Sequence, residues 1–374
     1  MKTAVLISCF DWYKSRLQPI KLELEKNQYK VIVLLSDFIH EKKTKITEKF
    51  SECTYISVKP YKKNVSVKRL LSHYFFAKDV LRQLNIIRPD LVYALLPPNS
   101  VSHVCRKYKL KNPNIKLILD VIDMWPESMP GKRYHNTLPF LYWKKLRDNS
   151  LKEADHIFTE CTLYQEKLDP DLRDKSSTLF LYKEDNELFM SVTDRENQRE
   201  CRDGKQVLKL CYLGSINHII DIDGICQVVE YLSKKYAVNV RIIGKGERKD
   251  AFLDALNKTD AEINYYGAIY DEAEKFRLLG NCDFALNMMI ESVNVGLTIK
   301  SIDYLSYGLP LINNIKGDTW KLVETENIGI NLRKDKPIEI LPEIEHDHVN
   351  AIYRKYFTKN AFIKSLSEGF KGMI

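Results

Sequence analysis

The chain has 374 residues and a formal net charge of +8, with 44% hydrophobic and 29% charged residues. This length is sufficient for two domains with cores of their own, and no apolar run approaches the roughly 20 residues that cross a bilayer. The eight cysteines are scattered, with no ligand spacing to histidine. We therefore expect free thiols in a reducing cytosol, and no metal site.

The charge is uneven along the chain. Residues 1–190 contain 33 Lys and Arg against 23 Asp and Glu, whereas residues 191–374 contain 25 against 27. A basic N-terminal half suits an anionic membrane face or an anionic lipid acceptor, and no nucleic-acid-binding motif accompanies it. Lys62 to Arg82 and Lys132 to Arg147 mix basic and aromatic residues, which is typical of a peripheral membrane surface; a solvated face with aromatic residues in the core explains them equally well.

Strand and helix patterns alternate through the N-terminal half, which predicts a parallel sheet with helices on both faces. The expected strands are 3–8, 30–35, 90–96, 116–122 and 155–159, and the expected helices are 13–26, 73–84, 99–108, 138–152 and 163–168. A polar, charged stretch between Tyr182 and Gly204 indicates the linker between two domains.

A second alternating series follows the linker. The expected strands are 207–214, 239–244, 263–267 and 282–289, and the expected helices are 224–234, 250–256 and 271–279, with an amphipathic helix at 357–370. The first three strands end on Gly214, Gly244 and Gly267. Ligands of open α/β sheets bind at the carboxyl ends of strands, where glycine allows close approach of the backbone. We therefore favour one binding crevice over three unrelated loop starts.

The stretch from Val295 to Asn313 predicts a turn, a helix beginning near Thr298, and a strand. Gly308 fits the left-handed position that ends such a helix, and Pro310 cannot continue it. The first amides and Lys300 would form an anion site, with Asp303 one turn further on to accept hydrogen bonds from hydroxyls. A diphosphate beside a ribose would suit this arrangement. The same pattern is also explained by an ordinary αβ unit with a surface lysine and aspartate.

Five motifs resemble those of retaining GT-B glycosyltransferases from bacterial surface-polysaccharide pathways. K-S-I-D-Y-L-S-Y-G-L-P-L-I at 300–312 is similar to the family signature K-x-x-E-Y-(L/M)-x-x-G-x-P-V-I, and L-D-V-I-D-M-W-P-E-S at 119–128 to D-x-R-D-x-W-P-E. Y-L-G-S-I, R-I-I-G-K-G and Y-Y-G-A-I resemble three glycine loops of the family, in the expected order. Val295 stands where many relatives carry a glutamate that contacts the donor sugar. Many relatives also carry an arginine and a lysine shortly after the first glycine, where this chain has Ser215, Asn217 and His218.

The resemblance implies an α/β GT-B fold, with two Rossmann-like domains facing a cleft and a C-terminal helix that crosses back to the first domain. It implies an acceptor domain at 1–190 with the helix 352–374, and a nucleotide-sugar domain at 191–351. The implied donor-diphosphate residues are Gly214, Ser215, Lys245, Thr298, Ile299 and Lys300. Those near the ribose and base are Asp303, Gly244, Gly267 and Ala268, and Asp123 is the implied catalytic residue. Without the resemblance, Asp123 is better explained as a cap of the turn that follows it.

The expected function is retaining transfer of a sugar from a nucleotide-diphosphate sugar to a lipid-linked or other saccharide acceptor in surface-polysaccharide biosynthesis. We expect no cofactor beyond this co-substrate, no metal and no nucleic-acid partner. The expected location is the cytoplasm, at the inner face of the cell membrane if the basic surfaces bind anionic lipid. Two alternatives remain: a GT-B nucleotide-sugar 2-epimerase and a non-catalytic glycosyltransferase-like subunit.

Overall fold

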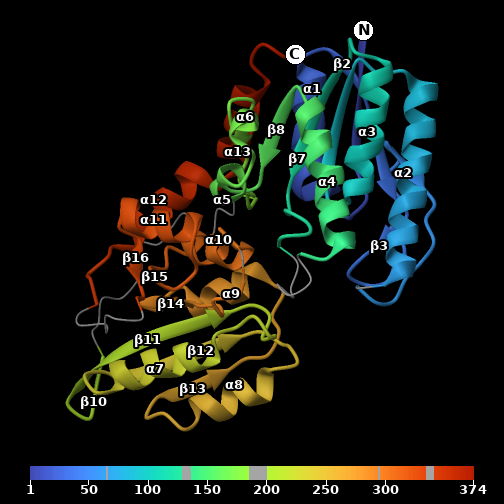
Figure 1. The fold of residues 1–374 in the computed structure, drawn as a ribbon. Coiled ribbons are helices and arrows are strands. Elements are labelled where there is room, and N and C mark those ends of the chain that lie inside the picture. The colour runs from blue at the N-terminus through green and yellow to red at the C-terminus, as the bar shows by residue number, and fades with distance from the viewer. Residues whose placement is uncertain (65, 129–135, 185–199, 294, 334–340) are drawn as a thin grey trace. The chain divides into compact units, whose positions relative to one another are not determined.

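The computed structural model describes residues 1–64, 66–128, 136–184, 200–293, 295–333 and 341–374. The chain divides into two compact units (Figure 1): the first is Met1–Leu181 with Phe362–Ile374, and the second is Tyr182–Ala361. The predicted boundary at residue 190 lies outside the described residues. The predicted boundary at 351 falls within helix α12 (His346–Tyr356).

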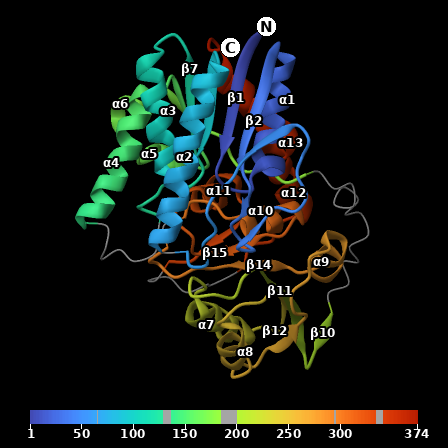
Figure 2. The same cartoon turned by 90° about the vertical axis from the view of Figure 1, so that its right-hand side faces the viewer.

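The first unit is built on a parallel sheet with the strand order β5-β2-β1-β6-β7-β8-β9. Ala4 to Ile7 of β1 are completely buried, because helices cover both faces of the sheet. Helices α1 and α13 lie on one face, and α2, α3 and α4 on the other (Figure 2). The strands are β1 (Lys2–Ser8), β2 (Tyr29–Ser36), β5 (Cys53–Ile56), β6 (Leu91–Leu96), β7 (Lys116–Val121), β8 (His156–Thr159) and β9 (Ser176–Thr178).

The helices of this unit follow the predicted pattern, with α2 extended at its start. Ser66 caps α2, and its side chain accepts a hydrogen bond from the backbone N–H of Arg69. The predicted helix began only at His73, because the basic run before it hid this cap. The elements are the π-helical turn η1 (Tyr13–Leu17), α1 (Gln18–Lys26), α2 (Val67–Ile87), α3 (Asn99–Lys111), α4 (Leu138–Glu153), α5 (Thr162–Glu166), α6 (Pro170–Arg173), and a hairpin of β3 (Phe38–Ile39) and β4 (Thr44–Lys45).

A buried ion pair holds the first unit together. Arg16 Nε donates to Asp120 Oδ2 at 2.7 Å, and both side chains are fully buried. The Tyr93 hydroxyl donates to the same carboxylate at 2.6 Å. Helix α13 (Lys359–Phe370) returns to this unit, where the Phe370 ring lies 6.0 Å from that of Phe158. The predicted return of the C-terminal helix to the first domain is therefore confirmed.

The second unit has the strand order β13-β12-β11-β14-β15-β16, with β10 antiparallel to β11. Because β11 lies between β12 and β14, the order reverses at the carboxyl end of β11, which is the position where open α/β sheets bind ligands. The strands are β10 (Cys201–Arg202), β11 (Lys205–Leu213), β12 (Ala237–Ile243), β13 (Glu262–Tyr265), β14 (Phe284–Asn287), β15 (Leu311–Asn313) and β16 (Gly329–Asn331).

Six helices of the second unit are described. They are α7 (Ile222–Ser233), α8 (Lys249–Leu256), α9 (Glu272–Leu279), α10 (Ile299–Ser306), α11 (Asp318–Glu326) and α12. The end of α10 is as predicted: Gly308 has φ +70°, and its N–H donates to Leu305 O at 3.0 Å. In the described ranges, no helix is long and apolar enough to cross a membrane.

Candidate functional site

Three strands of the second unit, β11, β12 and β13, are followed by glycines whose backbones contact neighbouring strand ends. Gly214 N–H donates to Ile243 O at 2.9 Å, and Gly244 N–H donates to Gly267 O at 2.8 Å. A Cβ atom on residue 244 would lie 2.0 Å from Gly214 O, so only glycine fits at this position. The predicted glycines Gly214, Gly244 and Gly267 therefore meet at one edge of the sheet.

Helix α10 begins at the same edge. Thr298 caps it, because its Oγ1 accepts a hydrogen bond from Ser301 N–H at 3.0 Å. The Lys300 side chain runs across the end of β11: its Cδ lies 3.7 Å from the position of a Cβ on Gly214, and its Nζ lies 5.1 Å from the centre of the Tyr212 ring. Burial lowers the pKa of Lys300 to about 8. The Lys300 side chain therefore packs against the backbone of Gly214.

The remaining predicted diphosphate residues are more exposed. The Ile299 side chain is 64% exposed, which leaves only its backbone N–H for the predicted role. Ser215 O accepts a hydrogen bond from the Tyr212 hydroxyl at 2.8 Å. Lys245 is exposed and its Nζ lies 5.4 Å from the centre of the Tyr270 ring. Ala268, predicted near the base, is exposed directly after Gly267.

Asp303 is engaged by a lysine that sequence reasoning missed. Lys183 Nζ lies 2.7 Å from Asp303 Oδ1 and 2.6 Å from Glu272 Oε2, and the Tyr307 hydroxyl donates to Glu272 at 3.0 Å. Lys183 belongs to the polar stretch interpreted as the linker, so nothing in its pattern distinguished it from a solvated residue. Within the described residues, Asp303 Oδ2 accepts no hydrogen bond.

A ladder of three asparagines fixes the start of α10. Asn287, Asn313 and Asn331 are in register at the ends of β14, β15 and β16. The Asn287 and Asn313 side chains are hydrogen-bonded at 2.9 Å, and Ser301 Oγ donates to Asn287 Oδ1 at 3.2 Å. The ladder therefore ties the capping turn of α10 to the sheet. Its signal was present in the sequence, since each of these strands ends on asparagine.

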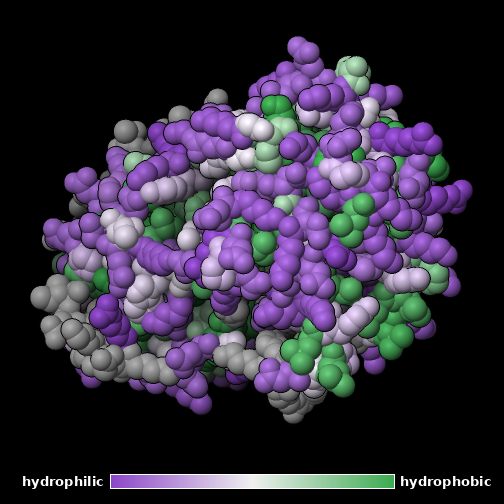
Figure 3. Space-filling view, turned by 45° about the horizontal axis from the view of Figure 1, so that its top comes forward, coloured by the Kyte–Doolittle hydropathy of each residue, from purple (hydrophilic) through white to green (hydrophobic). Residues whose placement is uncertain are grey.

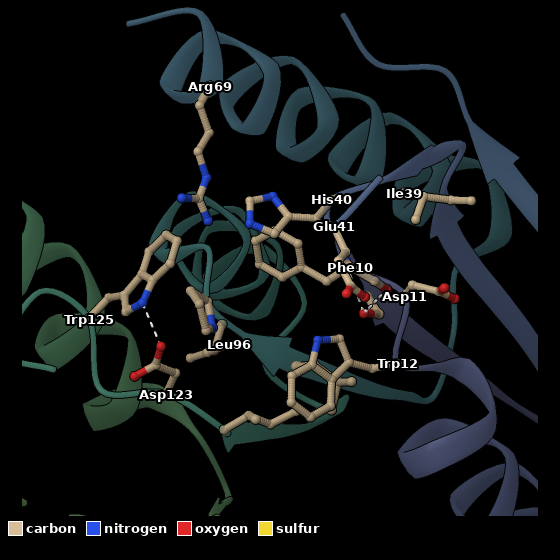
Figure 4. A pocket seen from close by; sticks show the side chains of 14 residues that line it. Phe10, Asp11, Trp12, Ile39, His40, Glu41, Arg69, Leu96, Asp123 and Trp125 are labelled. Atoms are coloured by element: carbon tan, nitrogen blue, oxygen red, sulfur yellow. Dashed lines mark hydrogen bonds between the residues drawn. The ribbon is translucent and has the colours of Figure 1, made fainter. Parts of the chain in front are cut away.

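The first unit has a cavity of about 350 Å³ at the carboxyl ends of β1, β6 and β7. Figure 4 shows its walls, to which the loop after β1 contributes Phe10, Asp11 and Trp12, and α2 contributes Arg69. Predicted Asp123 lines this cavity together with Trp125, whose Nε1 donates to Asp123 Oδ2 at 2.6 Å. Burial raises the pKa of the Asp123 carboxyl. Asp123 therefore lies in a cavity and does not merely cap a turn.

No cluster of three or more His, Cys, Asp or Glu that could hold a metal ion occurs among the residues that the structure describes. The predicted sites thus form two constellations. One is in the second unit, with Gly214, Gly244, Gly267 and Lys300 at its centre. The other is in the first unit, around Asp123.

Full-length likeness to solved structures identifies the fold. The chain matches HepE of Anabaena in complex with UDP at a TM-score of 0.63 and 11% identity, covering 100% of both chains. It matches the apo form of the lipopolysaccharide outer core galactosyltransferase WaaB at 0.63 and 12%, again over 100% of both. A UDP-GlcNAc 2-epimerase from Neisseria meningitidis bound to UDP-GlcNAc gives 0.52 and 13%, over 99% of both.

The chain therefore has the GT-B fold, with two Rossmann-like units, as the motifs predicted. No protein-family model matches the sequence, and no curated protein matches it. At identities this low, the likeness establishes the architecture, and activity has to be argued from the residues of the two constellations.

Proposed function

We propose that the protein is a glycosyltransferase that uses a nucleotide-diphosphate sugar as its donor and needs no metal or other cofactor. The observation that carries this proposal is the packing of Lys300 across Gly214, 3.7 Å from the position of its missing Cβ. This packing places a cation and the N-terminus of a helix beside the backbone at the carboxyl end of β11. Such an arrangement suits a diphosphate. The fold shared with HepE, whose structure holds UDP, supports the same assignment.

The chemistry assigned to the second unit is stabilisation of the leaving group. Transfer passes through an oxocarbenium-like state as the bond to diphosphate breaks, so the charge that develops on the diphosphate must be held. Lys300 and the N–H groups that open α10 would hold it, while Asp303 binds a ribose hydroxyl. In this scheme the leaving phosphate helps to deprotonate the acceptor, and the reaction retains the anomeric configuration.

The acceptor is assigned to the first unit. Asp123 would accept a hydrogen bond from a sugar hydroxyl and orient it, which converts binding energy into rate. We propose a lipid-linked saccharide of a bacterial surface-polysaccharide pathway as the acceptor. The aromatic walls of the cavity support a saccharide, because Phe10, Trp12 and Trp125 offer apolar faces beside the carboxylates of Asp11 and Asp123.

Contact with the inner face of the cell membrane belongs to this proposal. Leu70, Leu71 and Tyr74 on α2 are 47%, 47% and 57% exposed. On α4, Leu138 and Tyr142 are 82% and 65% exposed. Both helices begin at the same end of the first unit (Figure 1), and hydrophobic side chains gather at the lower right of the space-filling view (Figure 3). Exposed lysines accompany them, which suits anionic lipid.

The predicted membrane stretches need one correction. Arg69 and Phe76 of the first stretch and Arg147 of the second are buried, so they belong to the interior and cannot face lipid. The burial of Arg147 is explained by its ion pairs with Glu127 and Asp148. Lys132, where the second stretch begins, lies outside the described residues.

A panel of nucleoside diphosphates and their sugars tests the proposal. Titration calorimetry with UDP, GDP, ADP and dTDP should find one that binds, and the matching nucleotide sugar should release it only when a saccharide acceptor is added. Proton NMR of the product should show the same anomeric configuration as the donor. If none of the four binds, the catalytic assignment is wrong and a non-catalytic subunit is the better description.

The second candidate is a nucleotide-sugar 2-epimerase, favoured by the full-length likeness to the Neisseria meningitidis enzyme. An epimerase returns a sugar that is still joined to its nucleotide, whereas a transferase releases nucleoside diphosphate. The same panel therefore separates them: conversion of the donor to an epimeric nucleotide sugar without an acceptor would replace the transferase proposal.

A further inference from the structure

Arg69 is the one buried arginine without an acidic partner among the described residues. The others are Arg16, which pairs with Asp120, and Arg147, which pairs with Glu127 and Asp148. Arg69 is only 7% exposed; its Nη1 donates to Asn64 O at 2.8 Å, and its guanidinium also interacts with the Tyr61 hydroxyl. Its Nε is buried and has no hydrogen-bond partner. Burying a charge without an ionic partner destabilises the folded state. We therefore expect a ligand to pair with this guanidinium.

The guanidinium points into the cavity of the first unit, between Trp125 and His40 (Figure 4). Its Cζ lies 4.5 Å from the centre of the Trp125 ring and 5.8 Å from the rings of Phe10 and Tyr61. Aromatic faces stabilise a cation without neutralising it, so the site remains attractive to an anion. The neighbouring imidazoles add no permanent charge, because burial lowers the pKa of His40 to about 4 and that of His73 to about 3.

We propose that Arg69 recognises a carboxylate on the acceptor, so that the cavity takes an acidic sugar. The assignment rests on the proposed function, since it names the acceptor class of that same site. A guanidinium binds a carboxylate through paired hydrogen bonds, and such bonds are stronger where water is excluded. The aromatic walls would cover the apolar face of the sugar ring, while Asp123 accepts from a hydroxyl.

The charges around the cavity favour a carboxylate over a phosphate. Asp11, Glu41 and Asp123 all line it, and among the described lining residues Arg69 is the only permanent cation. A phosphate monoester carries about −1.5 to −2 charges near pH 7, whereas a sugar carboxylate carries one. The three acidic side chains would repel the phosphate more strongly, and one partly engaged guanidinium could not neutralise it. A monoanion is therefore the better match.

Matched pairs of simple sugars test this without any variant. The probes are the methyl glycosides of glucuronic, galacturonic and mannuronic acid, each compared with its neutral parent by ligand-observed NMR titration of the full-length protein. At least one uronide should bind about tenfold more tightly than its parent, the gain expected of a charge-assisted hydrogen bond. Equal affinities in all three pairs, or no binding of any probe, would overturn the proposal.

Variants assign the preference to the residue. In Arg69→Gln the preferred uronide should bind no better than its parent, whereas Lys68→Gln, which removes an exposed charge from the same helix, should keep the preference. Thermal unfolding shows whether Arg69→Gln is folded, and Arg69→Lys serves as a second variant that keeps the charge but loses the paired geometry. If folded Arg69→Gln still prefers the uronide to its neutral parent, the assignment to Arg69 is wrong.

Two further arms separate the alternatives. The 6-phosphate of each parent sugar should bind more weakly than the uronide; if it binds more tightly, the carboxylate assignment is wrong. Binding of nucleoside diphosphate is measured in a separate titration. If no nucleoside diphosphate binds but a uronide is preferred, the proposed function is wrong and the Arg69 site is supported. If a nucleoside diphosphate binds but uronide and parent have equal affinities, the Arg69 assignment is wrong and the proposed function is unaffected.

Discussion

The two sheets of this protein present their carboxyl ends to a ligand in different ways. In the first unit the edge is lined by side chains with functional groups: Asp123, Arg69 and Trp125 surround a cavity. In the second unit the edge is lined by backbone, because Gly214 and Gly244 directly follow β11 and β12, and the Lys300 side chain packs against Gly214. A ligand at the first edge is distinguished by the chemistry of side chains, and a ligand at the second by shape and charge.

Under the proposed function, this difference assigns acceptor specificity to the first unit and diphosphate binding to the second. Diphosphate is common to all nucleotide-sugar donors, so a backbone edge with one cation is sufficient to hold it. Acceptors differ in their hydroxyls and charges. Buried polar side chains discriminate among them, because a buried donor or acceptor left without a hydrogen-bond partner weakens binding. We therefore expect substitutions that add atoms to damage the second edge, and substitutions that exchange functional groups to damage the first.

The largest effect is expected from Gly244→Ala. The new Cβ would lie 2.0 Å from Gly214 O, a backbone atom that cannot move alone. We expect loss of measurable nucleotide binding and about 3 kcal/mol of destabilisation, the upper range for overpacking. The control is Gly204→Ala, which lies outside the site, meets nothing within 4 Å and costs only the strain of its φ of +76°, about 1 kcal/mol. Calorimetry and thermal unfolding measure both, and normal binding by Gly244→Ala would contradict the backbone description.

Next in size is Asp123→Asn, which exchanges one functional group at the first edge. The transfer rate should fall about 100-fold, as for loss of a positioned carboxylate, while nucleotide affinity stays the same. Because burial raises the pKa of Asp123, wild-type activity should decline as the pH falls through a value above the ordinary carboxyl pKa of about 4. That acidic limb should vanish in the variant.

Asp171→Asn, an exposed substitution in the same unit, serves as the control for Asp123→Asn and should change neither rate nor pH profile. A variant Asp123→Asn with wild-type turnover would show that the carboxylate is not needed, and the contrast between the two edges would then rest on Arg69 alone.

Lys300→Met should weaken nucleotide binding about 30-fold at neutral pH, the loss expected of a charge-assisted contact. Because burial lowers the pKa of Lys300 to about 8, its charge is present below that pH and lost above it. Wild-type affinity should therefore fall by about tenfold between roughly pH 7 and pH 9. Lys300→Arg should keep its affinity over that range, and a flat wild-type profile would show that this cation does not bind the diphosphate.

The smallest effect is expected at the surface of the first unit. Replacing Leu70 and Leu71 by serine should reduce co-sedimentation with vesicles rich in phosphatidylglycerol by several fold, since each buries only part of its apolar surface in lipid. Ile86→Ser on the same helix, 65% exposed but at its other end, is the matched control. Equal binding by the double variant and the control would exclude this surface as the lipid contact.

Much of the fold was predictable because local patterns are strong in buried parallel strands. Runs such as A-V-L-I in β1 and L-V-Y-A-L-L in β6 are apolar throughout, and the predicted strands lie at these positions. The missed strands β5, β9 and β16 have only weak patterns, such as S-S-T, and are supported by pairing with a neighbour. The glycines at the strand ends and the start of α10 near Thr298 were equally local, which is why the residues that meet at this edge could be predicted.

The sequence by itself determined the alternation of strands and helices, the glycine edge of the second unit and the position of Asp123 after a buried strand. Only the tertiary structure decided what these residues meet. Asp120 and Asp123 are three positions apart in one motif, yet one is locked to Arg16 in the core and the other lines a cavity. The pairing of Asp303 with Lys183 and the isolation of Arg69 were likewise hidden, because partners distant in the chain are fixed by packing and leave no local pattern.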